Sequence, residues 1–136
     1  MNRLCAKIGK QAGYSLIELM VALAVLGIVS SAATVGYGKF SIKAKRQDAI
    51  TLLSSTVLRL ERCFTLEGSY NGACTLKNSS DDGFYSLVTD RQAQSYTLSA
   101  VPVPGRSQAN DAECGTFEIT STAVKSATGS LNQACW

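Results

Sequence analysis

A long apolar segment near the N-terminus constrains this chain more than any other feature. Between Leu19 and Val35 there is no charged residue and no proline. Extended back to Tyr14, the run reaches roughly twenty residues, enough for a helix to cross a ~30 Å hydrocarbon core. Glu18 stands at its beginning, and a carboxylate is costly in lipid unless water or a cation reaches it. We expect a membrane-spanning helix in which Glu18 is either solvated by headgroups or paired with a cation.

The residues before this run are basic. Arg3, Lys7 and Lys10 precede it without any acid among them, as in the first part of an export signal. Beyond residue 13 the chain has equal numbers of basic and acidic residues. The net positive charge therefore belongs to the leader and does not indicate a nucleic-acid-binding protein.

The cysteines indicate the compartment of the rest of the chain. Cys5 lies in the leader, and the other four follow the apolar run. An even number of cysteines in a small domain indicates two disulfides and an oxidising compartment. Basic residues flank both ends of the run, four after it against three before, so charge alone does not orient it. The cysteines place the downstream domain outside the cytoplasm.

The pattern beyond the apolar run predicts an α+β domain. Apolar residues at Ile50, Leu53, Val57, Leu60 and Phe64 alternate spacings of three and four, which is typical of an amphipathic helix. We expect one helix from about Tyr14 to Leu66. Three β-rich segments follow at residues 84–89, 95–103 and 115–120, with a shorter one at 123–125. They predict a three- or four-stranded antiparallel sheet laid on the helix, with Pro102 ending the second strand or placing it at an edge.

Catalysis is not expected. The chain has no histidine, so no Ser-His or Cys-His nucleophile can form. The cysteines lack the CxxC spacing of a zinc site, and residues 78–83 lack the distal glutamate of a calcium-binding EF-hand. We therefore expect neither a metal nor a cofactor.

The segment "GYSLIELM", residues 13–20, resembles the prepilin signature of type IV pilins and related pseudopilins. The matching positions are Gly13, Tyr14 and Glu18, with tyrosine where the family usually has phenylalanine. The resemblance implies that prepilin peptidase cleaves between Gly13 and Tyr14 and methylates the new amino group of Tyr14. It also implies that Glu18 pairs with the amino terminus of a neighbouring subunit in a filament. An ordinary secretory signal, cut near the "SSAA" at residues 30–33, is the alternative, but gives Gly13 and Glu18 no role.

The segments "YTLSA" and "CGTFEITSTAVKSATG" are similar to PilE-class minor pilins. This resemblance implies the type IV pilin fold, with a removed leader (1–13), a transmembrane and filament-core helix (14–38) and a globular head (39–136). It implies a structural minor pilin that primes or supports pilus assembly, for twitching motility, adhesion or DNA uptake. Its partners would be prepilin peptidase, other major and minor pilins, and the inner-membrane assembly platform. The chain would cross the inner membrane once, with its head in the periplasm, before joining an extracellular pilus.

Four cysteines permit three disulfide pairings. We expect Cys63 to bond to Cys74 and Cys114 to Cys135, because this pairing closes the shortest loops. In the resemblance to PilE-class pilins, Cys114 and Cys135 also match the C-terminal loop.

Two other functions remain open. A type II secretion pseudopilin shares the N-terminal signature, although the C-terminal cysteine pair favours a pilin. A DNA-receptor competence pilin is the second alternative. From residue 47 onward the chain has six basic and nine acidic residues, whereas nucleic-acid-binding proteins usually have a basic surface. The charge of the head does not support a nucleic-acid partner.

Overall fold

The computed structural model describes residues 13–136, and for residues 32–36 it describes only the helical backbone. Most of the leader, including its three basic residues and Cys5, lies outside the described residues. The chain divides into two units, one ending at Gly38 and the other covering Lys39–Trp136. Each unit is described by itself.

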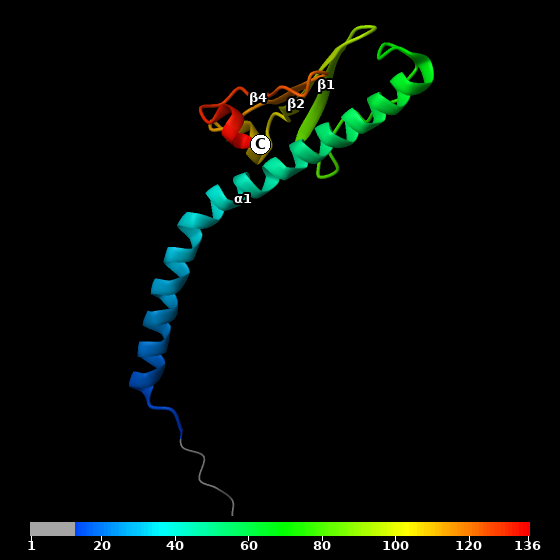
Figure 1. Cartoon of the computed structure of the whole chain (residues 1–136). Coiled ribbons are helices and arrows are strands. Elements are labelled where there is room, and N and C mark those ends of the chain that lie inside the picture. Colours follow the sequence, from blue (N-terminus) through cyan, green and yellow to red (C-terminus); the bar gives the residue numbers. More distant parts are fainter. Residues whose placement is uncertain (1–12) are drawn as a thin grey trace, which may run out of the picture. The chain divides into compact units, whose positions relative to one another are not determined.

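Helix α1 (Leu16–Glu67) contains 52 residues and is continuous through both units (Figure 1). It begins and ends close to the expected limits. In the first unit, the large apolar side chains between Leu16 and Val29 are exposed. Across the described residues, no helix meets the combined length and apolarity required of a membrane span.

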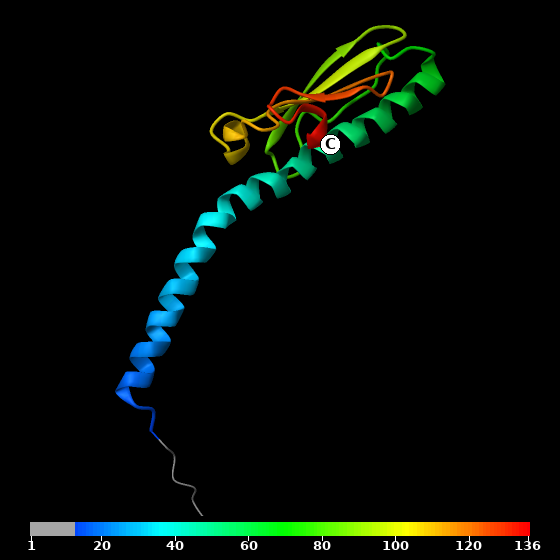
Figure 2. The same cartoon turned by 60° about the vertical axis from the view of Figure 1, so that its left-hand side comes forward.

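The second unit combines the C-terminal part of α1 with a four-stranded antiparallel sheet. The strands are β1 (Tyr85–Arg91), β2 (Tyr96–Pro102), β3 (Phe117–Thr120) and β4 (Lys125–Ala127), in the spatial order β1-β2-β3-β4. The sheet lies along the second half of the helix (Figure 2). Each strand therefore pairs with its neighbour in sequence, and one face of the sheet is buried on α1.

The core forms between this face and the apolar stripe of α1. Leu53 and Leu60 of the expected stripe are fully buried, while Ile50, Val57 and Phe64 are partly buried against the core. On the sheet, the fully buried side chains alternate with outward ones, as the two-residue period of a strand requires. These inward residues are Tyr85, Leu98, Ala100 and Phe117. The expected α+β arrangement of a long helix and an antiparallel sheet is confirmed.

Two details of the sheet differ from the sequence prediction. The last strand covers Lys125–Ala127 rather than residues 123–125, because a turn occupies the residues before it. In that turn Ala123 has a φ of 59°, and its N–H donates to the carbonyl of Thr120. Pro102 does end β2, but β2 lies between β1 and β3, so the alternative of an edge strand is wrong.

Both disulfides have the sequential pairing. Cys63–Cys74 joins the last turns of α1 to the loop that follows, and Cys114–Cys135 joins the segment before β3 to the C-terminal tail. The second bond is buried, whereas both cysteines of the first are partly exposed. The tail is also held by Trp136, whose ring meets that of Phe117 edge-on at 5.7 Å between centroids.

The C-terminal loop lies directly on the segment that contains Cys114. Gly129 donates its N–H to the carbonyl of Cys114, and Leu131 donates to that of Glu113. A Cβ atom built at Gly129 would overlap the backbone of Glu113 and Cys114. Glycine is therefore required at position 129 by this close approach of two backbones.

We predict that Gly129→Ala destabilises the second unit by about 2 kcal/mol or more, because the backbone it meets cannot move aside. Gly72→Ala is the matched control. A Cβ at Gly72 would meet only the end of the flexible Glu67 side chain, so its effect should be small. Thermal unfolding of the two full-length variants in detergent, followed by circular dichroism, makes the comparison. Equal melting temperatures would contradict the packing argument.

Candidate functional site

The N-terminal segment holds the residues predicted for processing and assembly. Helix α1 is preceded by Gly13, Tyr14 and Ser15. The carbonyl of Ser15 accepts hydrogen bonds from the N–H groups of Glu18 and Leu19, at 3.0 and 3.2 Å. Glu18 lies in the first helical turn, where a carboxylate interacts favourably with the positive end of the helix dipole. Tyr14 is 86% exposed. The structure thus leaves both Tyr14 and Glu18 accessible to other molecules.

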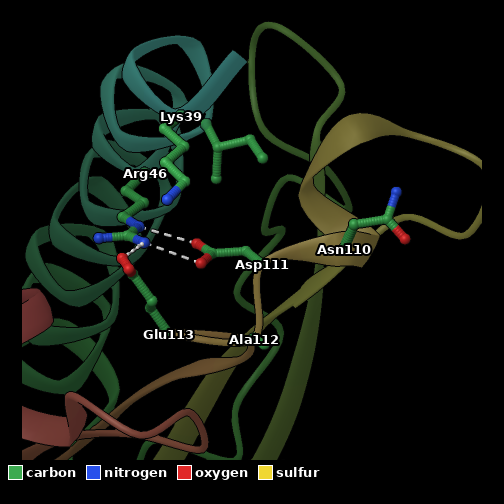
Figure 3. Close-up of a pocket in the computed structure, with 7 residues that line it drawn as sticks. Lys39, Arg46, Asn110, Asp111, Ala112 and Glu113 are labelled. Atoms are coloured by element: carbon green, nitrogen blue, oxygen red, sulfur yellow. Dashed lines mark hydrogen bonds and ion pairs between the residues drawn. The ribbon is translucent and has the colours of Figure 1, made fainter. Parts of the chain in front are cut away.

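A buried ion pair dominates the second unit. Nε and Nη2 of Arg46 on α1 each donate to one oxygen of Asp111, both at 2.8 Å (Figure 3). Nη2 also donates to Glu113 at 2.6 Å. Arg46 is 7% exposed and Asp111 is 5% exposed, whereas the side chain of Glu113 is 62% exposed. The hydrogen bond with Asp111 raises the pKa of Arg46 above its usual range although burial opposes it, so the guanidinium remains charged.

Other polar contacts hold the segment that carries these carboxylates against α1. The fully buried amide of Gln108 donates to the carbonyl of Ile42 at 3.2 Å and to the hydroxyl of Tyr85 at 2.8 Å. The backbone N–H of Cys114 donates to Asp111 at 3.3 Å. The loop between β2 and β3 is thereby bonded to both the helix and β1.

An open cavity of about 240 Å³ adjoins the ion pair. In Figure 3, Lys39 and Glu113 lie on opposite sides of the Arg46 guanidinium, and Asn110 points away from it. The residues that line the cavity are Lys39, Ile42, Arg46, Asn110, Asp111, Ala112 and Glu113. Both carboxylates of the lining are bonded to Arg46, but Asp111 is buried whereas most of the Glu113 side chain is exposed.

A second polar cluster fixes the C-terminal end of α1. The carboxylate of Glu61 accepts hydrogen bonds from the hydroxyl groups of Tyr70 and Tyr96, each at 3.1 Å. The ring of Tyr70 stacks on Phe64 at 4.4 Å between centroids. Burial and then the hydrogen bond with Glu61 raise the pKa of both tyrosines. Burial likewise raises the pKa of Tyr85.

Sequence reasoning did not find the Arg46 cluster. In the sequence, Arg46 was considered only as one of the four basic residues that follow the apolar run, which are Lys39, Lys43, Lys45 and Arg46. A signal was present, because Arg46 lies four residues before Ile50 and thus continues the buried stripe toward the N-terminus. A charged residue at a core position requires a partner, but the partners lie 65 and 67 residues away in sequence.

The described residues also show no group of three or more histidine, cysteine, aspartate or glutamate side chains placed to hold a metal. The contacts found in the second unit connect structural elements to one another. They suit a domain that presents a fixed surface.

Two protein-family models match this chain. A prokaryotic N-terminal methylation motif matches residues 8–34. The family described as type IV minor pilin ComP, DNA uptake sequence receptor, matches residues 36–118, which is more than half of the chain. The chain belongs to the ComP family of type IV minor pilins. The expected identification as a type IV minor pilin is confirmed, and the match includes Arg46, Asp111 and Glu113 of the head.

We predict that Arg46→Met destabilises this minor pilin by about 3–5 kcal/mol, because the buried Asp111 carboxylate would lose its counter-ion. Arg46→Met/Asp111→Asn should recover part of this loss. The matched control is Lys77→Met, since Lys77 and Asp81 form an exposed pair. Its effect should stay below about 1 kcal/mol. Urea unfolding of the full-length proteins in detergent measures both, and an equal effect of the two single substitutions would refute the prediction.

A second prediction concerns alkaline pH. Because the pKa values of Tyr70, Tyr85 and Tyr96 are raised on folding, their stabilising contribution is complete below about pH 10, the ordinary tyrosine value. It is lost as the pH rises through their higher folded values. Absorbance of phenolate at 295 nm should therefore increase in two stages, the second coinciding with unfolding seen by circular dichroism. A single stage completed before any unfolding would show that these hydroxyls are not protected.

Proposed function

We propose that this protein is anchored in the bacterial inner membrane by residues 14–38, with its disulfide-bonded head (39–136) in the periplasm, and is then incorporated into a type IV pilus. Prepilin peptidase would cleave between Gly13 and Tyr14 and methylate Tyr14. The mature chain would join other major and minor pilins through the inner-membrane assembly platform.

The observation that carries this proposal is the continuity of α1 from the methylation motif into the head. The motif match covers Gly13, Tyr14 and Glu18, and the same helix then provides one layer of the core of the pilin domain. The exposed apolar side chains of its first unit need lipid or other helices around them. Gly13 has open space around it, so its role would be in recognition by the peptidase rather than in this fold.

Glu18 would act in assembly. Cleavage would create an ammonium group at Tyr14, about one helical turn from Glu18. In a filament core of low dielectric, an unpaired carboxylate is costly, and pairing with the amino group of a neighbouring subunit removes that cost. This pairing would favour the correct register between subunits. The match to a type IV minor pilin family also favours a pilus over a type II secretion pseudopilus.

We predict that Glu18→Gln is processed and membrane-inserted as well as the wild type, yet its incorporation into pili falls at least tenfold. The expected cost of leaving one buried charge unpaired is about 3–5 kcal/mol. Immunoblots of sheared filaments and of membranes give the ratio, with Ser15→Ala as the control. Mass spectrometry of the mature wild-type chain should find N-methyl-tyrosine at its start. Wild-type levels of Glu18→Gln in filaments, or a mature chain starting near Ala33, would contradict the proposal.

DNA binding is a second candidate, because the matching family is described as a DNA uptake sequence receptor. In the head, the side chains of Lys45 and Arg106 both lie over the aromatic ring of Phe84. Nζ of Lys45 lies 4.5 Å from the centre of the Phe84 ring, and the guanidinium carbon of Arg106 lies 5.8 Å from it. Lys45 also donates to the hydroxyl of Ser107 at 3.0 Å. Phe84 thus orients two groups suited to neighbouring phosphates of a nucleic acid.

We predict that Lys45→Gln/Arg106→Gln weakens binding of duplex DNA by the full-length protein and lowers the slope of log K against log salt by about two, one unit for each lost phosphate contact. Arg59→Gln/Arg62→Gln removes the same charge elsewhere on α1 and should leave the slope nearly unchanged. Fluorescence anisotropy over a range of salt concentrations measures both. Equal slopes for the two double variants would place the contacts elsewhere.

A further inference from the structure

The Cys63–Cys74 disulfide lies beside an open groove on an exposed face of α1. The groove has a volume of about 520 Å³, and Cys63 itself lines it. The residues that line the groove are Ser55, Leu58, Arg59, Arg62, Cys63 and Leu66. Their spacing of three, four, seven, eight and eleven residues from the first places them on one face of the helix. Cys63 is therefore part of a surface that another molecule can reach.

The two disulfides of the head differ in their access to solvent. Cys114 has no exposed surface and Cys135 is 8% exposed, whereas Cys63 and Cys74 are both partly exposed. Exchange of a disulfide requires a thiolate to reach one of its sulfur atoms. The first bond is therefore open to exchange in the folded head, and the second is closed to it.

The groove is positively charged. Arg59 and Arg62 line it together with no acidic residue, and neither forms an ion pair with another described residue. Glu61 and Glu67, on the same part of α1, bond instead to tyrosine hydroxyls and to a backbone N–H. Guanidinium groups attract a thiolate and stabilise its negative charge. The arginines thus favour the approach to Cys63 of the species that carries out exchange.

The loop that contains Cys74 is also held by contacts that do not depend on the disulfide. Tyr70 is buried, its N–H donates to the carbonyl of Ala93 at 3.1 Å, and its hydroxyl donates to Glu61 at 3.1 Å. Opening the bond would therefore release Cys74 from α1 while Tyr70 stays in the core. The head can pass through a reduced state without losing its fold.

We propose that Cys63 is the site at which a dithiol protein of the periplasm exchanges with the Cys63–Cys74 disulfide. Leu58 and Leu66, 60% and 86% exposed, give the groove apolar sides that suit a protein surface better than a small thiol. The site goes beyond incorporation into a pilus and shares with the proposed function only the periplasmic location of the head.

The exchange takes place in two steps. A thiolate of the partner attacks Sγ of Cys63 and forms a mixed disulfide, while the Cys63–Cys74 bond breaks and Cys74 leaves as a thiolate. The second thiol of the partner then attacks the partner's own sulfur in the mixed disulfide and releases Cys63. Two electrons and two protons pass from the dithiol to the head, and the partner becomes a disulfide. The same steps in reverse form the bond.

Trapping identifies the sulfur that is attacked. The full-length protein in detergent, carrying Cys5→Ser to remove the fifth thiol, is mixed with a thioredoxin whose second active-site cysteine is serine. After quenching with N-ethylmaleimide, peptide mapping should find the thioredoxin bonded to Cys63, with Cys74 alkylated and Cys114–Cys135 intact. Adducts mainly on Cys74, adducts on Cys114 or Cys135, or absence of any adduct would overturn the proposal.

Reduction rates test the arginines. Arg59→Gln/Arg62→Gln should slow reduction of Cys63–Cys74 by intact reduced thioredoxin at least threefold, and added salt should narrow the difference. Lys45→Gln/Arg106→Gln removes the same charge elsewhere on the head and should leave the rate unchanged. Equal rates for the two double variants would show that the groove does not attract the thiolate.

The leucines test the commitment to a protein partner. Leu58→Ser/Leu66→Ser should slow reduction by thioredoxin at least threefold and leave reduction by dithiothreitol unchanged, because the small dithiol does not need the apolar sides. An unchanged rate with thioredoxin would overturn the assignment to a protein. Circular dichroism shows whether each variant is folded, and both leucines are exposed, so their replacement leaves the core intact.

The results separate this site from the proposed function. Selective exchange at Cys63, together with absence of the wild-type chain from sheared pili, supports the site and contradicts incorporation into a pilus. Presence of the wild-type chain in pili, without any exchange by thioredoxin, overturns the site alone.

Discussion

The buried pair between Arg46 and Asp111 is the interaction on which the head depends. Arg46 belongs to the helix and Asp111 to the loop between β2 and β3, so their two hydrogen bonds join the two layers of the fold. Removing two charges from water is costly, and only close geometry with further hydrogen bonds offsets that cost. The backbone N–H of Cys114 supplies one such bond to Asp111. The pair therefore acts as a fixed connection whose loss leaves a buried charge.

The C-terminal loop supports this connection from the other side. Its hydrogen bonds reach the carbonyls of Cys114 and Glu113, and the Cys114–Cys135 disulfide closes the same region covalently. Gly129 allows the two backbones to approach closely enough for these bonds. The position of Glu113 at the cavity thus depends on residues near the end of the chain, about twenty residues away in sequence.

Local sequence patterns predicted the long helix and the presence of the strands, but not the two short 3-10 helices at Ser107–Asn110 and Asn132–Cys135. The spacing of apolar residues identified the helix and its buried stripe, and the loop lengths identified the disulfide pairing. The fourth strand was placed two residues early because a turn with Ala123 at positive φ leaves no marked signal in the sequence. The Arg46 and Glu61 clusters were missed for another reason. Each joins residues that become neighbours only after the sheet has packed on the helix, and a single sequence does not show which distant partner a charge will find.

The two carboxylates of the Arg46 cluster differ in burial and in the number of hydrogen bonds that they accept from Arg46. Asp111 is buried and takes two hydrogen bonds from Arg46, whereas Glu113 takes one and is largely exposed. Nη2 of Arg46 serves both carboxylates, because it donates to Asp111 at 2.8 Å and to Glu113 at 2.6 Å. The same guanidinium therefore holds the loop on the helix through the buried Asp111 and also bonds the largely exposed Glu113 at the surface.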